Sequence, residues 1–185
     1  MTVSFAITGE PAAFVGDDEL LAACRRGDVR AYEQLYAAHS GRMKSIALHM
    51  LGNRQDAEDA VQETFLKVFR GVNGFQGQSA VGTWMCRILI NTCYDALRKQ
   101  RPEAAEMPAP AAMPGRGSSV PLKVALEGAL GRIAPNHRLV FWLYEVEGYR
   151  HSEIGQILQV PEGTSKSWLF EAKRALRRML GEGLE

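Results

Sequence analysis

The sequence lacks the residue patterns of a metal centre or a disulfide framework. Its three cysteines, Cys24, Cys86 and Cys93, are odd in number and do not have the spacing of zinc ligands. The four histidines are scattered, with no pair at i and i+4. We therefore expect no metal and no other cofactor. We also expect the cysteines, all in helical stretches, to be buried thiols, with a redox or metal-binding role as the alternative.

Long apolar runs and a strong excess of one charge are absent as well. No apolar run approaches the roughly 20 residues that span a bilayer, and Met1 to Val15 lacks the features of a secretion signal. With 22 Lys and Arg against 21 Asp and Glu, the net charge is only +1. This balance excludes a uniformly basic coat for nucleic acid but leaves room for separate patches. The sequence thus predicts a cytoplasmic protein without membrane insertion.

One segment of unusual composition divides the chain. Residues 101–121 are rich in Pro, Ala, Gly and Ser, and such a stretch buries too little apolar surface to offset its ordering entropy. We interpret it as a flexible linker. The predicted organisation is a tail at 1–16, a first domain at 17–100, the linker, and a second domain at 122–185.

Both predicted domains have apolar residues at helical spacing, and neither shows useful period-two alternation. In the first domain this spacing predicts a helix that ends at Gly52-Asn53 and a second helix with Val61, Phe65, Val68 and Phe69 on its apolar face. A third helix is expected after a loop at 71–79. Ser79 is the expected N-cap of that third helix. The predicted fold class is all-α, with two small helical domains.

The second domain predicts a helix-turn-helix motif. After apolar helical stretches at 122–133 and 139–144, a short helix is expected at 152–158. A tight connection at Gln159-Val160 leads to a longer helix at 161–180, with Pro161 at its start. In this motif the second helix enters the major groove of DNA.

Acidic and amide side chains cluster early in the second predicted helix. Asp56, Asp59, Gln62 and Glu63 fall on adjoining faces, opposite the apolar side. A solvated helix start, favoured by the helix dipole, is one interpretation. A carboxylate-bridged metal site would need Glu-x-x-His partners on neighbouring helices, and the sequence has none. Between the metal site and a face that docks on another protein, the docking face is therefore the better functional interpretation.

The loop at 71–79 and the helix after it combine aromatic rings, amides and cations. Recognition of single-stranded DNA needs this mixture, because extruded bases must be stacked and edge-read while the backbone is neutralised. Taken individually, Phe75 and Trp84 would more readily be core residues, so the joint pattern carries the prediction. The candidate residues are Asn73, Phe75, Gln76, Ser79, Trp84, Asn91, Arg98 and Lys99.

The second helix of the helix-turn-helix motif carries candidate contacts to duplex DNA. Polar and aromatic side chains gather near its N-terminal end, where such helices meet bases and phosphates, and cations follow. The candidates are Glu162, Thr164, Ser165, Lys166, Trp168, Phe170, Lys173 and Arg174. The flanking Arg177 and Arg178 strengthen the interpretation.

Three motifs in register resemble those of a known family. They are Asp56-Ala-Glu-Asp-Ala-Val-Gln-Glu-Thr-Phe65, Thr83-Trp84 with Asn91, Asp95 and Arg98, and Glu153-Ile154 followed by Val160-Pro161-Glu-Gly163-Thr164 and Lys166-Ser167. In this order and spacing the chain resembles the small two-domain sigma factors of bacterial RNA polymerase, the extracytoplasmic-function class. The resemblance covers nearly all of residues 17–180.

The resemblance implies a role for each candidate set. The acidic cluster would dock on the clamp coiled coil of the largest subunit of core RNA polymerase. The loop set would capture and help melt the minus-ten element, and the helix-turn-helix set would meet duplex DNA at the minus-thirty-five element. The linker would thread toward the catalytic cleft and the RNA exit path. An anti-sigma factor is a further implied partner.

Two other classes of function are weighed against a sigma factor. A self-sufficient helix-turn-helix regulator is the alternative, but it needs neither the acidic face nor the aromatic loop and usually dimerises, whereas we expect a monomer. An enzyme would need a nucleophile and base, a metal site or a phosphate loop, and the sequence contains no such constellation. We therefore expect no enzymatic activity.

The chain also departs from the family pattern. Val81-Gly82 stands where Phe and Arg are frequent, Ser165 where an aliphatic residue is usual, and Trp168 where Arg is frequent. Phe170 lies close to a common His position, and Arg150 replaces the usual Ser cap. Without a guanine-reading Arg, minus-thirty-five specificity is expected to rest more on apolar contacts and DNA shape.

Overall fold

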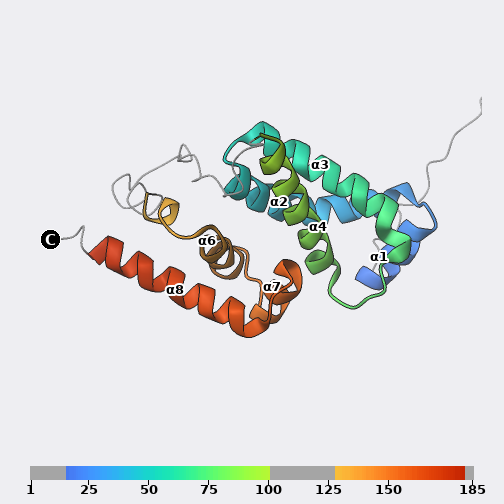
Figure 1. Ribbon diagram of the computed structural model, residues 1–185. Coiled ribbons are helices and arrows are strands. Elements are labelled where there is room, and N and C mark those ends of the chain that lie inside the picture. Colours follow the sequence, from blue (N-terminus) through green and yellow to red (C-terminus); the bar gives the residue numbers. More distant parts are fainter. Residues whose placement is uncertain (1–15, 101–127, 182–185) are drawn as a thin grey trace, which may run out of the picture.

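The computed structural model describes residues 16–100 and 128–181, and within these ranges all regular structure is helical (Figure 1). The all-α prediction is therefore confirmed. The predicted tail before Gly16 and the predicted linker at 101–121 lie outside the described residues. Among the described residues, no helix combines the length and apolarity that a membrane crossing needs.

Four helices make up the first half of the described chain: α1 (Asp17–Arg25), α2 (Val29–Leu51), α3 (Arg54–Gly71) and α4 (Val81–Gln100), with a 3-10 turn at Val72–Gly74 before α4. Side-chain caps set their limits. The Asp28 carboxylate accepts the Arg30 N–H at 3.0 Å at the start of α2. Gly52 ends α2 at φ 76°, a conformation that suits glycine, and the Asn53 side chain accepts the Asp56 N–H at 2.8 Å. The predicted stop at Gly52-Asn53 is thus confirmed.

The expected N-cap of α4 is wrong. The helix begins at Val81, so the residue directly before it is Ala80, and the Trp84 N–H donates to the Ala80 carbonyl at 3.1 Å. Ser79 lies one residue too early, and its hydroxyl donates instead to that same carbonyl at 3.3 Å.

The second half contains α6 (Pro135–Phe141), which continues into a π-helical turn (Trp142–Val146), then α7 (His151–Leu158) and α8 (Glu162–Gly181). A helical turn at 128–131 precedes α6. Helices α7 and α8 with their short connection form the predicted helix-turn-helix. The Glu153 carboxylate accepts the Arg150 N–H at 2.8 Å, which caps α7 although Arg150 has replaced the usual Ser.

Close packing at the connection between α7 and α8 requires a glycine. Gln159 takes a left-handed conformation at φ 57°, and the Val160 N–H returns to the Gly155 carbonyl at 3.0 Å. A Cβ atom at Gly155 would lie 2.8 Å from the Val160 carbonyl oxygen. No side chain fits there unless the turn moves.

A methyl group at Gly155 is therefore expected to destabilise the protein. Overpacking against backbone in Gly155→Ala should lower the free energy of unfolding by about 1–3 kcal/mol, measured by urea denaturation. Gly163→Ala is the matched control, because its Cβ would meet nothing within 4 Å and alanine favours a helix by about 0.5–1 kcal/mol. Equal stability of the two variants would contradict this account of the turn.

Of the two hydrophobic clusters formed by the described residues, the larger one joins the two halves. Leu139, Leu143 and Ile154 of the second half belong to the same buried cluster as Met85 and Leu89 of α4. Helix α4 lies against α2 and α3 on one side and against α7 on the other (Figure 1). The cysteines are also buried, as predicted. The two predicted domains thus pack together, an arrangement that the sequence does not indicate.

Candidate functional site

The acidic cluster forms an exposed face on the first half of α3. Asp59, Gln62 and Glu63 are exposed, whereas Val61 on the opposite side is 1% exposed. Asp56 is half-buried, and its carboxylate and backbone N–H both bond to the cap residue Asn53. The face therefore presents three polar side chains to solvent from a helix that is held at its start and packed along its back.

Two large apolar side chains extend this face along α3. Leu66 and Phe69 are 56% and 55% exposed, although Phe69 was expected on the buried stripe. That expectation is wrong: Val68 is the buried residue, and Phe69 lies beside Tyr32 with ring centroids 4.7 Å apart. Neighbouring apolar residues in a sequence point 100° apart on a helix, so only one of this pair could reach the core.

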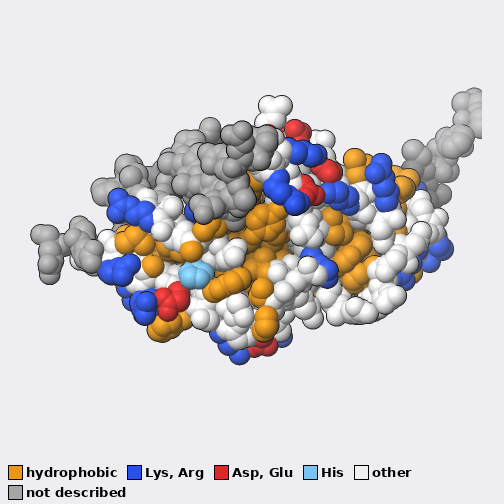
Figure 2. All heavy atoms as spheres, viewed as in Figure 1, with side chains coloured by type: hydrophobic (Ala, Val, Ile, Leu, Met, Phe, Trp, Pro, Cys, Tyr) orange, Lys and Arg blue, Asp and Glu red, His pale blue; other side chains and the backbone are white. Residues whose placement is uncertain are grey.

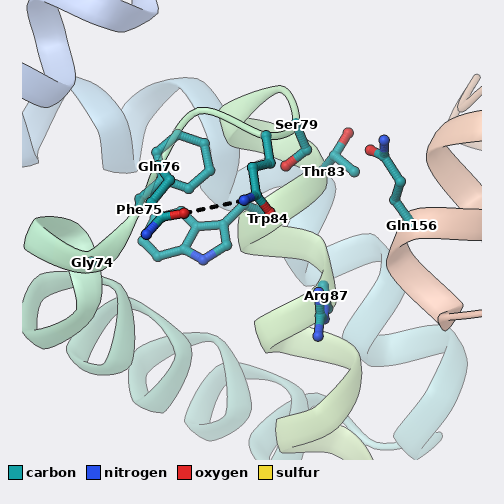
Figure 3. Close-up of a pocket in the computed structure, with 9 residues that line it drawn as sticks. Gly74, Phe75, Gln76, Ser79, Thr83, Trp84, Arg87 and Gln156 are labelled. Carbon is teal, nitrogen blue, oxygen red and sulfur yellow. Dashed lines mark hydrogen bonds between the residues drawn. The ribbon is translucent and has the colours of Figure 1, made fainter.

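A cavity of about 350 Å³ lies beside the predicted DNA-binding loop (Figure 3). Phe75 and Trp84 form a pair in its wall, with ring centroids 4.7 Å apart and planes inclined by 35°. Both rings are half-buried, so each packs on the core and still reaches the cavity. Gln76 accepts a hydrogen bond from Gln78 at 3.1 Å on the loop side. The residues that line the cavity are Gly74, Phe75, Gln76, Gln78, Ser79, Thr83, Trp84, Arg87 and Gln156.

An arginine from α1 holds this loop in place. The Arg25 guanidinium donates to the carbonyls of Val72 at 3.3 Å and Phe75 at 2.6 Å. Two charge-assisted bonds to backbone oxygens fix the turn that carries Phe75. Sequence reasoning missed Arg25, because its partners are about 50 residues away and nothing in the local pattern identifies them.

The remaining candidates of this set follow one face of α4. Trp84, Asn91 and Arg98 are seven residues apart, so they lie nearly in line along the helix. Asn91, Arg98 and Lys99 are exposed, and Arg98 pairs with Asp95 one turn earlier. Asn73 is exposed on the 3-10 turn, on the other side of the loop. The structure thus brings an aromatic ring, an amide and a cation into one stripe that starts at the cavity.

The candidates on α8 divide into exposed and buried residues. Glu162, Lys166 and Phe170 are exposed, with Phe170 61% exposed. The prediction is wrong for Ser165, which is fully buried with its hydroxyl 2.9 Å from His151 Nδ1. Trp168 is half-buried against the core, and its ring centroid lies 6.0 Å from that of His137.

Three cations of α8 have acidic partners in this structure. Lys166 pairs with Glu162 at 2.6 Å, Lys173 with Glu145 at 2.5 Å, and Arg174 with Glu171 at 3.0 Å. The hydrogen bond and charge of Lys166 lower the pKa of Glu162. Thr164 is half-buried beside this group. Exposed pairs of this kind contribute little to stability, so these cations can exchange partners at low cost.

The contact between the halves is built around a buried carboxylate that sequence reasoning also missed. Glu147 follows the π-helical turn and accepts hydrogen bonds from Ser45 at 2.6 Å and Trp142 at 3.2 Å. The Arg42 guanidinium lies 3.7 Å from the same carboxylate and 5.0 Å from the ring centroid of Tyr149. Serine and arginine of α2 thus meet one acid of the second half.

A buried histidine lies at this contact. His49 of α2 stacks on Trp142 with ring centroids 4.2 Å apart. Its burial, together with the charge of Arg138, lowers the pKa of His49 from 6.5 to about 4. Within the described residues, its Nε2 atom is buried without a hydrogen-bond partner.

The depressed pKa of His49 predicts acid sensitivity of the fold. Between pH 6.5 and about 4 the unfolded chain binds a proton that the folded chain excludes. The resulting stability is fully present above pH 6.5 and is lost as the pH falls toward 4, by about 3 kcal/mol at most. His49→Phe keeps the stacked ring and removes the titrating group. Urea unfolding at pH 7.5 and 4.5 should therefore show a smaller loss in the variant, and equal losses would contradict the assignment.

The described His, Cys, Asp and Glu side chains form no metal-binding group. Within residues 16–100 and 128–181, no group of three or more His, Cys, Asp and Glu side chains is arranged to hold a metal ion. Burial raises the pKa of the thiols of Cys86 and Cys93 to about 12, so both are protonated at neutral pH.

Comparisons with known proteins match both halves. The family model Sigma-70 region 2 matches residues 35–103, and the model Sigma-70, region 4 matches residues 123–176. The ECF RNA polymerase sigma factor SigM of Mycobacterium tuberculosis (strain H37Rv) is 32% identical over 89% of this chain and 85% of the relative. RNA polymerase sigma-H factor of Pseudomonas aeruginosa is 27% identical over 89% of this chain and 93% of the relative.

Solved structures show the same fold. CnrH in complex with the cytosolic domain of CnrY superimposes with a TM-score of 0.71 at 23% identity, over 90% of this chain and 97% of that one. The sigma factor RpoE of Bartonella quintana, solved with the anti-sigma factor NepR, superimposes with a TM-score of 0.68 at 23% identity, over 83% of this chain and 98% of that one.

Proposed function

Because the chain belongs to the extracytoplasmic-function (ECF) class of RNA polymerase sigma factors, it binds core RNA polymerase and directs it to promoters, and we propose here which surface performs each step. One observation carries the assignment. The region 2 match covers the acidic face and the aromatic loop, while the region 4 match covers the helix-turn-helix.

The acidic face of α3 is proposed to dock on the clamp coiled coil of the polymerase's largest subunit. Asp59, Gln62 and Glu63 are exposed on a helix whose position is fixed by its packed back and capped start. Exposed carboxylates select partners mainly through charge complementarity, and they speed association. The exposed Leu66 and Phe69 add apolar area one turn further along.

The cavity and the stripe on α4 are proposed to bind the melted minus-ten element. The inclined Phe75 and Trp84 rings offer a stacking surface, and neighbouring amides can read the edge of a base. A cavity of about 350 Å³ falls within the range of small-ligand pockets, which suits a single extruded base. Arg98 and Lys99 would then neutralise the phosphates that follow.

The first turns of α8 are proposed to enter the major groove at the minus-thirty-five element. Lys166 and Phe170 are exposed there, and the ion pairs of Lys166 and Arg174 can be exchanged for phosphate. The buried Ser165 hydroxyl contacts His151 of α7 and so ties α8 to that helix. A buried Ser165 and a half-buried Trp168 leave few side chains for direct base reading, which favours readout of DNA shape.

Further expectations concern the partners, the oligomeric state and the location of the protein. Two structural relatives were solved with partners, one of them named an anti-sigma factor, and we infer that this chain also has an anti-sigma partner. We infer a monomer in the free state, the cytoplasm as the place of action, and no catalysis of its own. A self-sufficient regulator is not favoured, because it would leave the acidic face and the cavity without a role.

Run-off transcription with core polymerase and a genomic promoter library tests the proposed function. We expect transcripts from a subset of promoters only when this chain is present. Transcription that is unchanged by its addition would overturn the proposal.

Reversal of two charges tests the docking face. Asp59→Lys with Glu63→Lys should abolish pull-down of core polymerase, because like charges would then face a basic partner. Asp17→Lys with Glu33→Lys makes the same charge change on exposed residues of α1 and α2 and should bind normally. Circular dichroism checks that both proteins remain helical. Undiminished binding by the α3 variant would refute the docking assignment.

Removal of one cation tests the placement of α8. Lys166→Ala should weaken binding of the holoenzyme to duplex promoters almost equally across sequences, because a lone ammonium meets phosphate rather than bases. The slope of log K against log salt should fall by about 0.9. Arg132→Ala, an exposed cation near the other end of α8, should leave the slope unchanged. Equal slopes in both variants would place Lys166 away from DNA.

A further inference from the structure

Arg25, at the end of α1, binds the backbone of the loop that carries Phe75. The loop passes beside α1 (Figure 1). The Arg25 guanidinium donates to the Val72 carbonyl at 3.3 Å and to the Phe75 carbonyl at 2.6 Å. In the part of the chain that the structure describes, the other hydrogen bonds of residues 73–79 stay within the loop or reach its neighbours Val72 and Ala80. Arg25 is therefore the hydrogen-bonded link from this loop to another helix.

The end of α1, from which Arg25 extends, is itself held in the core. Leu21 and Cys24 of α1 are buried. The Tyr32 hydroxyl of α2 donates to the Cys24 carbonyl at 3.0 Å, and the Gly27 N–H donates to the same carbonyl at 2.9 Å. A loop that is bound to Arg25 thus takes its position from α2 and the core.

The two acceptors of Arg25 have a geometry that suits a guanidinium. Val72 and Phe75 lie at the two ends of one 3-10 turn, because the Phe75 N–H returns to the Val72 carbonyl at 3.3 Å. Arginine presents its donors in a rigid planar fork, so one side chain can bind both carbonyls, whereas a lysine ammonium is a compact charge on a flexible stem. The two bonds therefore fix the direction of the turn as well as its place.

The Phe75 carbonyl that Arg25 binds belongs to the residue whose ring forms part of the cavity wall. Figure 3 shows the Phe75 ring and Gln76 beside Trp84, and the centroids of the two rings are 4.7 Å apart. A rotation of the Phe75 backbone would move its ring away from Trp84 and displace Gln76 with it. Arg25 itself does not line the cavity. Its bonds therefore act on the cavity from outside, through Phe75.

We propose that Arg25 is a positioning residue for minus-ten recognition, which holds the Phe75 carbonyl so that the Phe75 ring and Gln76 meet the extruded base. This inference rests on the proposed function of the cavity. Arg25 makes no contact with DNA in this role. Its consequence is that α1 belongs to the minus-ten site, although the match to Sigma-70 region 2 begins only at residue 35.

Selectivity among bases is the property that this link controls. Discrimination is a difference between the affinities for the right and the wrong base. A loop held in one position loses contacts when the wrong base enters, whereas a loop that can shift adapts to either base. Preorganisation also lowers the entropy that is lost on binding. Release of the loop therefore reduces selectivity more specifically than it reduces binding to core polymerase.

A randomised minus-ten element measures this selectivity. The template is a promoter found in the run-off experiment, with its minus-thirty-five element unchanged, its minus-ten positions randomised and a barcode in the transcribed region. Sequenced transcripts give the ratio of the most to the least used base at each position. Holoenzymes with wild type, Arg25→Ala, Arg25→Lys and Arg26→Ala are compared, and pull-down of core polymerase is measured for each.

Arg26→Ala is the matched control for charge. Figure 2 shows Lys and Arg side chains at the surface of the end of the molecule where Figure 1 places α1, so loss of a cation there needs its own comparison. Arg26 is exposed and directly follows Arg25, but it makes neither of the two bonds to the loop. Arg26→Ala should therefore keep the selectivity of wild type.

Both substitutions of Arg25 should reduce selectivity while core binding is retained. Arg25→Ala should lower the ratio by about tenfold at the position read by the cavity, the scale set by one hydrogen bond to a charged group. Arg25→Lys should also lower it, because lysine lacks the fork that binds both carbonyls. Unchanged selectivity in Arg25→Ala, full selectivity in Arg25→Lys, or loss of core binding by either variant would overturn the proposal.

Two further measurements separate positioning from a direct contact. Arg25→Ala should leave the slope of log K against log salt unchanged for promoter binding, whereas a lost phosphate contact would reduce it by about 0.7–0.9. Addition of Arg25→Ala to Phe75→Ala should cause no further loss of selectivity, because Arg25 acts through Phe75. A reduced slope or additive losses would overturn the proposal. Absence of any minus-ten preference in wild type would instead refute the proposed function of the cavity.

Discussion

The structure depends on α4 being packed on two sides at once. Its residues Met85, Leu89 and Ile90 are almost fully buried between the helices of the first half and the second half. The stripe of Trp84, Asn91 and Arg98 runs along a part of α4 outside this packing, and it is the stripe that we propose faces DNA. Because one helix carries both the core and the stripe, its burial fixes the direction in which the stripe points. The cavity, the loop and the contact with α7 all follow from that orientation.

Much of the local structure was predictable because local chemistry determines it. Gly52-Asn53 stops one helix and caps the next through the side chain of Asn53, and both features can be identified in the sequence. The acidic face was predictable for the same reason, since helical periodicity separates Asp59 and Glu63 from Val61. What periodicity cannot decide is which of two adjacent apolar residues faces inward, as the exposed Phe69 beside the buried Val68 shows.

The features that could not be predicted depend on partners distant in sequence. Arg25 binds carbonyls of the loop, and Ser45 meets Glu147, pairs separated by about 50 and about 100 residues. Ser165 looked like a DNA contact because it lies near the N-terminal end of the second helix of the motif, but His151 makes its burial possible by satisfying the hydroxyl. At Gly82 a Cβ would lie 3.3 Å from the imidazole ring of His39, so glycine at this departure from the family pattern leaves room for that ring against α4. Two departures thus have structural explanations.

The packing of the halves also limits which partners can open the molecule. A ligand shifts a conformational equilibrium only by its difference in affinity for the two states. A partner that touches Asp59 and Glu63 alone meets the same exposed side chains whether the halves are joined or apart, so it cannot separate them. Opening requires contacts that exist only after separation, such as the face of α7 that now lies against α4, or promoter DNA that reaches both surfaces. If α3 is the docking face, as we propose, it positions the protein, and the free energy of separating the halves must come from contacts of the second half and of DNA.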